Sequence, residues 1–413
     1  MRFGLLTQWY DPEPGPAAIP GMLARGLKAR GHEVRVVTGF PNYPTGVLAN
    51  GYRLRPRTHE ERDGVHVTRT ALYPSHKASA ASRLLTYGSF GFTASTLGLP
   101  GMRGLDALWV NYSPVTLAPA ALLATHLLGV PTVCHIGDLW PDTLAASGVD
   151  EKSPVGRVAI TGSGLAAHAM YRAATWVSYI SPGVGPELLR RGVPQDKLAY
   201  APMWADETLF HPDDADLRSE LGIAEDAVVL VYAGSIGAAQ GLQTLVDACA
   251  KVQDPRFVCL IAGSGTEEEA LRQRCDTLGV HNVRFLGRVA PESMSSLLAT
   301  ADGAYVGLNE HPLAQMTMPS KTQATLAAGC PLLVAGRGDV ANIIVESKAG
   351  WSVPSGDVEA LASAIVAICA TEPAQLAALG RRARDYYETT FALDEGVNRF
   401  ERLLLSAAER KPA

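Results

Sequence analysis

The stretch "AVVLVYAGSIGAAQGLQTL", from Ala227 to Leu245, decides the fold class of this chain. It begins with a run of β-branched and apolar residues, continues as a glycine-rich loop, and ends with the apolar spacing of a helix. A buried strand that turns directly into a helix is typical of the crossover unit of a parallel sheet. The stretch therefore predicts an α/β fold built on parallel strands.

The same alternation of strand and helix fills the chain in two blocks. Strand patterns occur in the first block at "RFGLLT", "VRVVTG", "VHVTRT", "DALWVNY", "PTVCHI" and "TWVSYIS", and in the second at "AVVLVYAGS", "FVCLIAGSG", "VRFLGRV", "GAYVGLN" and "PLLVAG". Two blocks predict two doubly wound, Rossmann-like domains, residues 1–204 and 205–390, with a helical segment, 391–413, that packs back on the first domain. Ligands of such sheets bind at the carboxyl ends of the strands, so we expect the domains to face each other across a cleft that holds the site.

Composition argues against several classes of function. The net charge of -5 over 413 residues, without a basic stripe, is unlike that of a nucleic-acid-binding protein. Six cysteines without a C-x-x-C pair, and histidines that do not cluster, argue against a metal site and indicate a reducing compartment. The amino-terminal sequence lacks the pattern of a signal peptide, so we expect a cytoplasmic protein.

The segment "MPSKTQATLAAGCP", Met318 to Pro331, indicates what the site binds. It has the features of a short helix with Lys321 in its first turn, where the helix dipole disfavours a cation unless an anion is near. The free N–H groups at Ser320 and Lys321 and the lysine charge would converge on one anion. Together with the glycine-containing loops at Gly15 and at Gly234 to Gly241, they indicate a dianionic ligand such as a nucleotide diphosphate.

Four segments of the chain resemble a known family: "TGFPNYPTG" (Thr38 to Gly46), "GDLWPDT" (Gly137 to Thr143), "AQGLQTL" (Ala239 to Leu245) and "PSKTQATLAAG" (Pro319 to Gly329). They are similar to the retaining glycosyltransferases of family 4, and most similar to the bacterial branch that transfers polysaccharide and aminosugar units. The resemblance implies a GT-B fold, a nucleotide-sugar donor held mainly by the second domain, and no need for a metal ion or other cofactor.

The resemblance also implies donor-binding residues. It places the loop from Gly234 and the helix from Pro319 at the diphosphate, the loop after "VRFLGRV" at the base, and "LNEHPLAQM" at the transferred sugar. The donor-binding residues expected in these segments and in the first loop are Gly15, Ser235, Gly237, Gln240, Arg288, Glu310, His311, Met318, Ser320, Lys321 and Gln323. Ala324 stands where the family has a glutamate that binds the ribose hydroxyls, and Gln323 could compensate only in part.

The segment "CHIGDLWPD", which follows a predicted strand of the first domain, supplies the catalytic candidates His135 and Asp138. Asp138 matches a recurrent family position and could orient the acceptor or accept its proton; it could equally cap the turn that follows. His135 could instead be a core histidine. Aromatic faces suit sugar rings and other flat acceptors, so we expect an acceptor wall of Tyr10, Asn42, Tyr43 and Trp140.

These features predict a retaining, metal-independent glycosyltransferase that moves a sugar from a nucleotide-diphosphate sugar to the hydroxyl, amine or thiol of a small soluble acceptor. Natural-product biosynthesis is one setting, because a composition rich in alanine and arginine is common in GC-rich genomes.

Other functions stay open at this point. A lipid-linked acceptor of cell-surface polysaccharide assembly is one alternative, although Pro74 to Phe92 offers only His76, Lys77 and Arg83 as positive charges for a membrane, so membrane contact would be at most peripheral. A nucleotide-sugar epimerase, a non-catalytic partner subunit and a homo-oligomer are others. The base, the sugar and the acceptor are not specified by the sequence.

Overall fold

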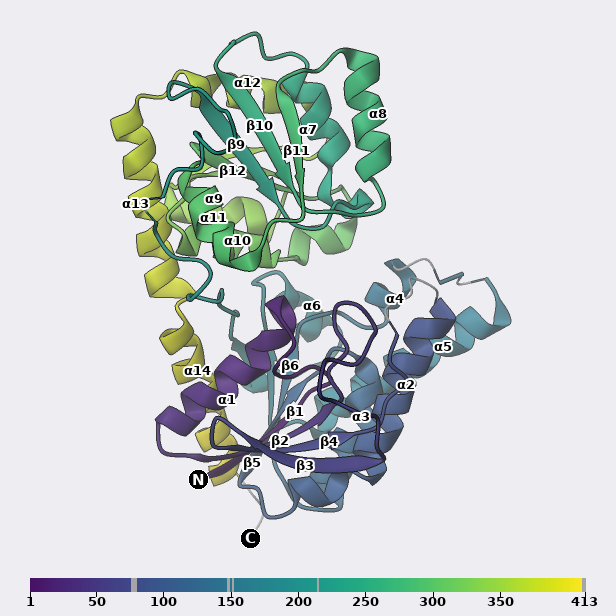
Figure 1. The fold of residues 1–413 in the computed structure, drawn as a ribbon. Coiled ribbons are helices and arrows are strands. Elements are labelled where there is room, and N and C mark those ends of the chain that lie inside the picture. Colours follow the sequence, from purple (N-terminus) through teal and green to yellow (C-terminus); the bar gives the residue numbers. More distant parts are fainter. Residues whose placement is uncertain (76–79, 147–148, 151, 214, 411–413) are drawn as a thin grey trace. The chain divides into compact units, whose positions relative to one another are not determined.

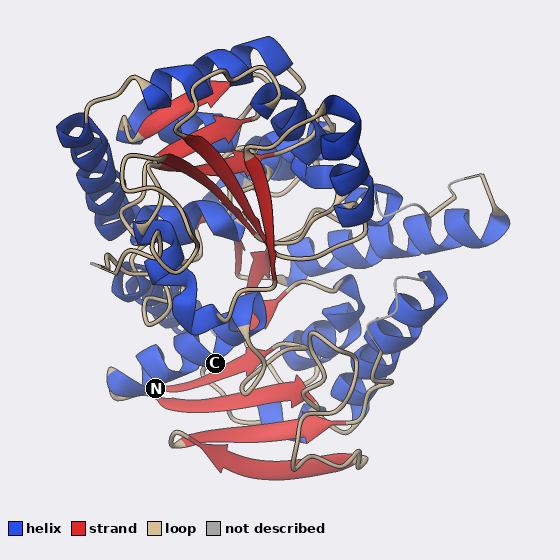
Figure 2. Ribbon diagram, turned by 45° about the horizontal axis from the view of Figure 1, so that its top comes forward, coloured by secondary structure: helices blue, strands red, loops and turns tan. Residues whose placement is uncertain are grey.

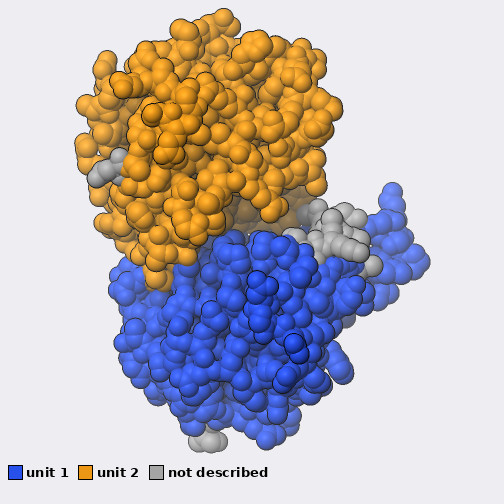
Figure 3. Space-filling model, in the orientation of Figure 1, with its two compact units in different colours: residues 1–203, 394–413 blue, residues 204–393 orange. Residues whose placement is uncertain are grey.

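The computed structural model describes residues 1–75, 80–146, 149–150, 152–213 and 215–410 (Figure 1). The chain divides into two compact units: unit 1 comprises residues 1–203 and 394–413, and unit 2 comprises residues 204–393 (Figure 3). The domain limits expected from the sequence lie within three residues of these division points.

Unit 1 is built on an eight-stranded sheet in the order β3-β4-β2-β1-β5-β6-β7-β8. Every neighbouring pair is parallel except β3 and β4, which form an antiparallel pair at one edge. The strands are β1 (Arg2–Leu6), β2 (Glu33–Gly39), β3 (Arg57–Arg62), β4 (Val65–Thr70), β5 (Ala107–Asn111), β6 (Thr132–Ile136), β7 (Trp176–Tyr179) and β8 (Leu198–Tyr200). The six strands from β4 to β7 have the order of a doubly wound sheet.

Helices cover both faces of this sheet (Figures 1 and 2). They are α1 (Ile19–Ala29), α2 (Ala80–Thr96), α3 (Ala118–His126), α4 (Asp142–Ala146), α5 (Pro154–Ala173), α6 (Val184–Arg190) and α14 (Leu393–Glu409), with short 3-10 turns at Gly15–Ala18, Leu99–Met102, Val115–Leu117 and Gln195–Lys197. The apolar stretch from Val115 to Ile136 forms a 3-10 turn, α3 and β6.

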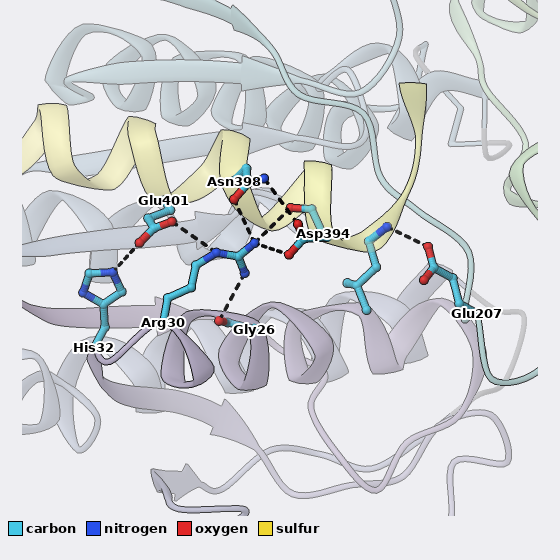
Figure 4. Close-up of polar contacts among 8 residues, drawn as sticks. Gly26, Arg30, His32, Glu207, Asp394, Asn398 and Glu401 are labelled. Atoms are coloured by element: carbon cyan, nitrogen blue, oxygen red, sulfur yellow. Dashed lines mark hydrogen bonds and ion pairs between the residues drawn. The ribbon is translucent and has the colours of Figure 1, made fainter. Parts of the chain in front are cut away.

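The last helix, α14, returns to unit 1 and packs beside α1 (Figure 4). Arg30 at the end of α1 donates to Oδ1 of Asn398 over 2.8 Å, and it also pairs with Asp394 and with Glu401. Nε2 of His32 lies 2.7 Å from Oε1 of Glu401. The side chains that α14 buries are Val397, Phe400, Leu404 and Ala407. Both charge pairing and apolar burial therefore hold this helix on unit 1.

Unit 2 is built on a six-stranded, fully parallel sheet in the order β11-β10-β9-β12-β13-β14. The strands are β9 (Val228–Ala233), β10 (Phe257–Ala262), β11 (Val283–Gly287), β12 (Gly303–Gly307), β13 (Leu332–Ala335) and β14 (Gly350–Val353). The helices are α7 (Leu242–Cys249), α8 (Glu268–Leu278), α9 (Met294–Ala299), α10 (Ser320–Ala327), α11 (Asp339–Ser347), α12 (Val358–Cys369) and α13 (Pro373–Thr390), with 3-10 turns at Ala238–Gln240, Pro291–Ser293 and Pro312–Met316.

The predicted fold class is confirmed, because each unit contains a doubly wound sheet of parallel strands. Three strands were not predicted: β3, β8 and β14, all of which lie at sheet edges. Edge strands are short or polar because only one side of them pairs, so the apolar signal that marks central strands is weak there.

Within the described ranges, no single helix is both long and apolar enough to cross a bilayer; the bent pair 358–369 and 373–409 passes that test jointly, on length and composition. All six cysteines are free and buried.

Candidate active site

Lys321 lies at the carboxyl edge of the unit 2 sheet, in the first turn of α10. Its Nζ atom donates to Oε1 of Gln240 over 2.6 Å and to the hydroxyl of Tyr232 over 3.0 Å, and it lies 4.2 Å from the centre of the Tyr232 ring. Within the described residues, Lys321 has no carboxylate partner. Burial without a counter-charge lowers the pKa of Lys321 to about 7.

The start of α10 is a free helix end. Pro319 precedes the helix in an extended conformation, no side chain caps it, and its first turn contains no acidic residue. Thr322 N–H bonds back to the Pro319 carbonyl over 2.8 Å, so Ser320 and Lys321 are the positions whose N–H groups point out of the helix start. An anion at this end would receive backbone N–H groups together with the lysine charge.

The loop after β9 passes directly beside this lysine. A Cβ atom on Gly234, whose φ is +147°, would lie 3.4 Å from Cε and Nζ of Lys321. A Cβ atom on Gly263, in the next loop, would lie 1.8 Å from the Gly234 carbonyl oxygen. Only glycine fits these two positions, so the loops after β9 and β10 approach each other closely beside the amine.

Several predicted donor residues gather at this edge of the sheet. Ser235 and Gly237 belong to the loop after β9, and the Ser235 carbonyl accepts a hydrogen bond from the Tyr232 hydroxyl. Arg288 follows β11, and its Nε donates to the Ser264 hydroxyl over 2.8 Å. The loops after β9, β10 and β11, together with the start of α10, thus supply backbone groups and the cations Arg288 and Lys321 to one edge of the sheet.

A second cluster lies at the ends of β12, β13 and β14. A pocket of about 280 Å³ is lined by Asn309, Glu310, Gln315, Arg337 and Ser355, all of them polar. Glu310 and Arg337 are both exposed and form no ion pair with each other or with another described side chain. The Asn309 N–H donates to the Ala239 carbonyl over 3.0 Å, which joins this pocket to the loop that holds Gln240. Hydroxyl-rich ligands suit such a lining, because every wall offers hydrogen bonds.

Three other predicted donor residues have mainly structural surroundings. His311 caps the turn at Pro312–Met316, where its Nδ1 accepts from Leu313 N–H over 3.2 Å. Met318 is 6% exposed and packs in the apolar core beneath α10. Gln323 is 4% exposed, and its Oε1 has no hydrogen-bond partner among the described residues. Neighbouring Ala324 is also buried, so neither residue presents an acidic group for a ribose.

The acceptor candidates of unit 1 are organised by a buried carboxylate, Glu13. Its Oε1 accepts from the N–H groups of Asn42 and Tyr43, both over 2.8 Å, and its Oε2 accepts from Tyr10 N–H over 3.0 Å. Burial raises the pKa of Glu13, whereas these three hydrogen bonds oppose that shift. Glu13 therefore joins the loop after β1 to the loop after β2, at the carboxyl edge of the sheet.

The side chains of these candidates are not equally accessible. Tyr10 is 1% exposed and Asn42 is 6% exposed, so both side chains pack beneath the loops. Tyr43 is half-buried. Gly15 is exposed, and its φ of +64° with open space around its Cα leaves its backbone accessible. Trp140 is 9% exposed, and its carbonyl accepts from Arg191 over 2.8 Å.

Asp138 directly follows β6, at the same edge of the unit 1 sheet. The residue is exposed. Desolvation nevertheless raises the pKa of Asp138, while the nearby Ser113 hydroxyl acts in the opposite direction. The helix that follows begins at Asp142, which pairs with Arg191 over 2.8 Å.

His135, which the sequence offered as a catalytic candidate, lies in the core of unit 1 and is the core histidine of the alternative reading. It is 1% exposed, its ring stacks on Trp109 and meets Phe400 edge-on, and its Nδ1 lies 3.0 Å from the Ser178 hydroxyl. Burial lowers the pKa of His135 to about 3, so the ring stays neutral. β6 lies between β5 and β7, and all five of its residues are buried, so the His135 side chain is buried as well.

Metal ligation has no candidate cluster: among the described residues, no group of three or more histidine, cysteine, aspartate or glutamate side chains could hold an ion. Sequence reasoning missed Tyr232, Arg337, Ser355 and Glu13. Arg337 directly follows a predicted strand, "PLLVAG", so the strand-end rule could have found it. Ser355 follows the unpredicted strand β14, and Tyr232 lies inside a strand.

Residues 15–204 match the glycosyl transferase 4-like domain, and residues 227–371 match the glycosyl transferases group 1. One curated relative is the putative colanic acid biosynthesis glycosyl transferase WcaI of Escherichia coli (strain K12), 28% identical over 326 residues, which cover 78% of this chain and 79% of the relative.

Solved structures show the same fold. Sucrose-phosphate synthase from Thermosynechococcus elongatus superposes with a TM-score of 0.76 at 19% identity, over 98% of each chain. Anabaena Alr3699/HepE in complex with UDP superposes with a TM-score of 0.69 at 18% identity, over 98% of this chain and 100% of that one. The two units therefore have the GT-B architecture.

Proposed function

Because this chain belongs to the family 4 glycosyltransferases of GT-B fold, we propose that it transfers a sugar from a nucleotide-diphosphate sugar, without a metal ion and with retention of configuration. The donor lies on unit 2 and the acceptor on unit 1. Sugar transfer is the activity common to the two matched domains, whereas the donor site, the stereochemistry and the acceptor are our proposals.

The observation that carries the donor site is the uncompensated Lys321 at the free start of α10. A diphosphate there would accept from the N–H groups of Ser320 and Lys321, and it would supply the negative charge that the amine lacks. The loop from Gly234 to Gly241 approaches the same amine and offers further backbone groups.

The reaction follows from this placement. When the bond between the anomeric carbon and the phosphate oxygen breaks, negative charge grows on the leaving diphosphate, and Lys321 with the helix start stabilises that charge. The acceptor oxygen forms the new bond to the anomeric carbon on the same face. Its proton passes to a base, for which we propose Asp138, since it is exposed and its raised pKa favours proton uptake.

For the sugar, we propose the pocket of Asn309, Glu310, Gln315, Arg337 and Ser355. Its five polar side chains come from the ends of the strands next to the loop of Gln240, where the sugar of a bound donor would extend from the diphosphate. Glu310 would accept from sugar hydroxyls and Arg337 would donate to them.

For the acceptor, we propose a precursor of a cell-surface polysaccharide. The relative WcaI is named for colanic acid biosynthesis, and this favours the polysaccharide alternative over the small soluble acceptor that the sequence alone favoured. The acceptor would then be a sugar hydroxyl on a lipid carrier.

Calorimetric titration with UDP, GDP, dTDP and ADP in EDTA, followed by incubation with the matching nucleotide sugars, tests this function. We expect binding of one base without metal, and transfer that requires an acceptor. An epimer formed without an acceptor would indicate an isomerase instead, and absence of binding to all four nucleotides would favour a non-catalytic subunit.

A further inference from the structure

The polar pocket at the ends of β12, β13 and β14 contains an arginine whose charge is not balanced. We call this pocket, which is lined by Asn309, Glu310, Gln315, Arg337 and Ser355, the sugar pocket. The Arg337 guanidinium has no hydrogen-bond or ion-pair partner among the described residues, and Glu310 does not pair with it. Water solvates an exposed arginine, but a ligand in the pocket displaces that water and must offer the guanidinium an acceptor.

The turn that carries Arg337 is fixed by the two glycines that flank it. Gly336 N–H donates to the Val353 carbonyl over 3.0 Å, which joins the turn to the end of β14. A Cβ atom on Gly338, whose φ is +71°, would lie 2.1 Å from the Gln315 carbonyl oxygen, so only glycine fits there. The backbone of Arg337 is thus held on both sides, and less ordering is needed when the side chain binds a ligand.

The order of the strands places Arg337 away from the proposed phosphates. Asn309, which follows β12, donates its N–H to the Ala239 carbonyl over 3.0 Å. The next residue of that loop, Gln240, contacts Lys321, so this wall of the pocket is the one nearest the phosphates. β13 pairs with β12 on the side away from β9, and neighbouring strands lie about 4.8 Å apart. Arg337, which follows β13, is therefore one strand further from the phosphates than Asn309.

A donor sugar presents different groups to these two walls. Its anomeric carbon carries the diphosphate, whereas C4 and the C6 group lie toward the other side of the ring. Glu310, beside Asn309, would then accept from hydroxyls near the anomeric carbon, and Arg337 would meet the groups of the far side. A hydroxymethyl group at C6 offers a guanidinium one neutral acceptor. A carboxylate there offers two oxygens in one plane, which a guanidinium binds through two parallel hydrogen bonds.

We propose that the donor sugar is a uronic acid and that Arg337 binds its C6 carboxylate in the sugar pocket. Gln315, whose amide has no partner among the described residues, supplies a further donor. A sugar with an ammonium group is a poorer ligand, because Arg337 would repel it. The carboxylate takes no part in the bonds that break and form at the anomeric carbon.

This proposal rests on the proposed function, because it names the sugar of the same donor. It does not concern the membrane contact considered for Pro74 to Phe92, where His76 and Lys77 lie outside the described residues.

The test is calorimetric titration of the full chain, in EDTA, with pairs of nucleotide sugars that differ only at C6. UDP, dTDP and ADP each carry glucuronic acid or glucose, and GDP carries mannuronic acid or mannose. For the base that the chain binds, we expect the uronic acid donor to bind at least about tenfold more tightly than the neutral donor, as for a charge-assisted contact.

Substitutions of Arg337 should change this preference in three different ways. Arg337→Ala should remove it, and Arg337→Glu should reverse it, because one carboxylate then faces another. Arg337→Lys keeps the charge without the two parallel hydrogen bonds, so it should retain only part of the preference. The matched control is Arg381→Ala, which removes another exposed arginine of unit 2 and should bind both donors like the parent protein.

Two results would overturn the uronic acid proposal alone: equal affinity of the parent for both donors of a pair, or a preference that survives in Arg337→Ala. Titration of the same samples with the nucleoside diphosphate reports on the donor site itself. Absence of that binding in the parent would overturn the proposed donor site and, with it, the assignment of the sugar.

Discussion

The amine of Lys321 lies 2.6 Å from Oε1 of Gln240, which ties the first turn of α10 to the loop after β9. Its other partner, the Tyr232 hydroxyl, is also neutral. The lysine is thus held in place without being neutralised by a described side chain. A bound anion would supply the negative charge that this arrangement lacks.

Affinity for the nucleoside diphosphate should depend on pH through Lys321. Burial lowers the pKa of Lys321 to about 7, and a bound diphosphate would raise that pKa, so binding takes up a proton above pH 7. Affinity should therefore be greatest near and below neutrality and fall by up to about tenfold per pH unit above it. The last ionisation of the ligand phosphate, at a pKa of about 6, lies below this range.

Calorimetric titration of the parent protein and of Lys321→Arg at several pH values above neutrality measures how affinity for the nucleoside diphosphate changes with pH. Arginine stays charged, so the variant should show a flat profile. Equal slopes in both proteins would show that another group titrates.

Ala324→Glu should tighten binding of a nucleoside diphosphate, because it restores the carboxylate with which the family holds the ribose. Two charge-assisted hydrogen bonds at about 1.5 kcal/mol or more each would give roughly a hundredfold gain. Inorganic pyrophosphate, which has no ribose, is the control ligand, and its affinity should not change. Because Ala324 is buried, the melting temperature must be measured alongside. A folded variant without the gain would show that this pocket holds the ribose by other groups.

Glu13→Gln should loosen the two acceptor loops. The amide can accept through only one of its two ends, whereas the carboxylate accepts from Tyr10, Asn42 and Tyr43. The free energy of unfolding should fall by about 1 to 3 kcal/mol in urea titrations, while nucleotide affinity stays unchanged. The control is Glu61→Gln on the exposed side of β3, with an expected effect within about 0.5 kcal/mol. Equal effects of both substitutions would show that Glu13 does not hold the two acceptor loops together.

Arg337→Ala should weaken binding of the sugar part of the donor and leave binding of the nucleotide part unchanged. Arg337 lines the polar pocket and has no described ion-pair partner, so its loss should weaken binding of the intact nucleotide sugar by about 10- to 150-fold. The nucleoside diphosphate alone should bind as before. Arg381→Ala, on the exposed side of α13, serves as the control. A loss that is equal for sugar-bearing and sugar-free nucleotides would place Arg337 at the phosphates.

The central strands could be predicted from the sequence because burial on both faces leaves continuous apolar runs, as in "VVLVYA". The edge strand β3, "RTHEER", alternates exposed and half-buried residues and lacks such a run. Its turn, Asp63 and Gly64, has φ of 52° and 71°, which is the two-residue hairpin that an Asp-Gly pair favours. The Asp-Gly dipeptide in the sequence could therefore have predicted this hairpin.

For the site, the strand-end rule and the charge of Lys321 predicted that the start of α10 and the loop after β9 lie together at one edge of the sheet, where Lys321 contacts Gln240. For other predicted site residues, the burial of the side chain decides whether it can contact a ligand. His135, Tyr10 and Met318 have the chemistry of site residues, but their side chains lie inside the core. His135 lies inside the buried strand β6. Tyr10 and Met318 lie in loops, where the direction of a side chain depends on loop packing that the sequence pattern does not contain.

The most direct test of the account is calorimetric titration of the preferred nucleoside diphosphate, in EDTA, into the parent protein and Lys321→Ala at pH 7. We predict metal-independent binding by the parent and a loss of about 1.5 to 3 kcal/mol in the variant, as expected for a charge-assisted contact. Lys348→Ala, at the exposed end of α11, should bind like the parent. Unaltered affinity of Lys321→Ala would contradict the assignment of this lysine to the donor phosphates.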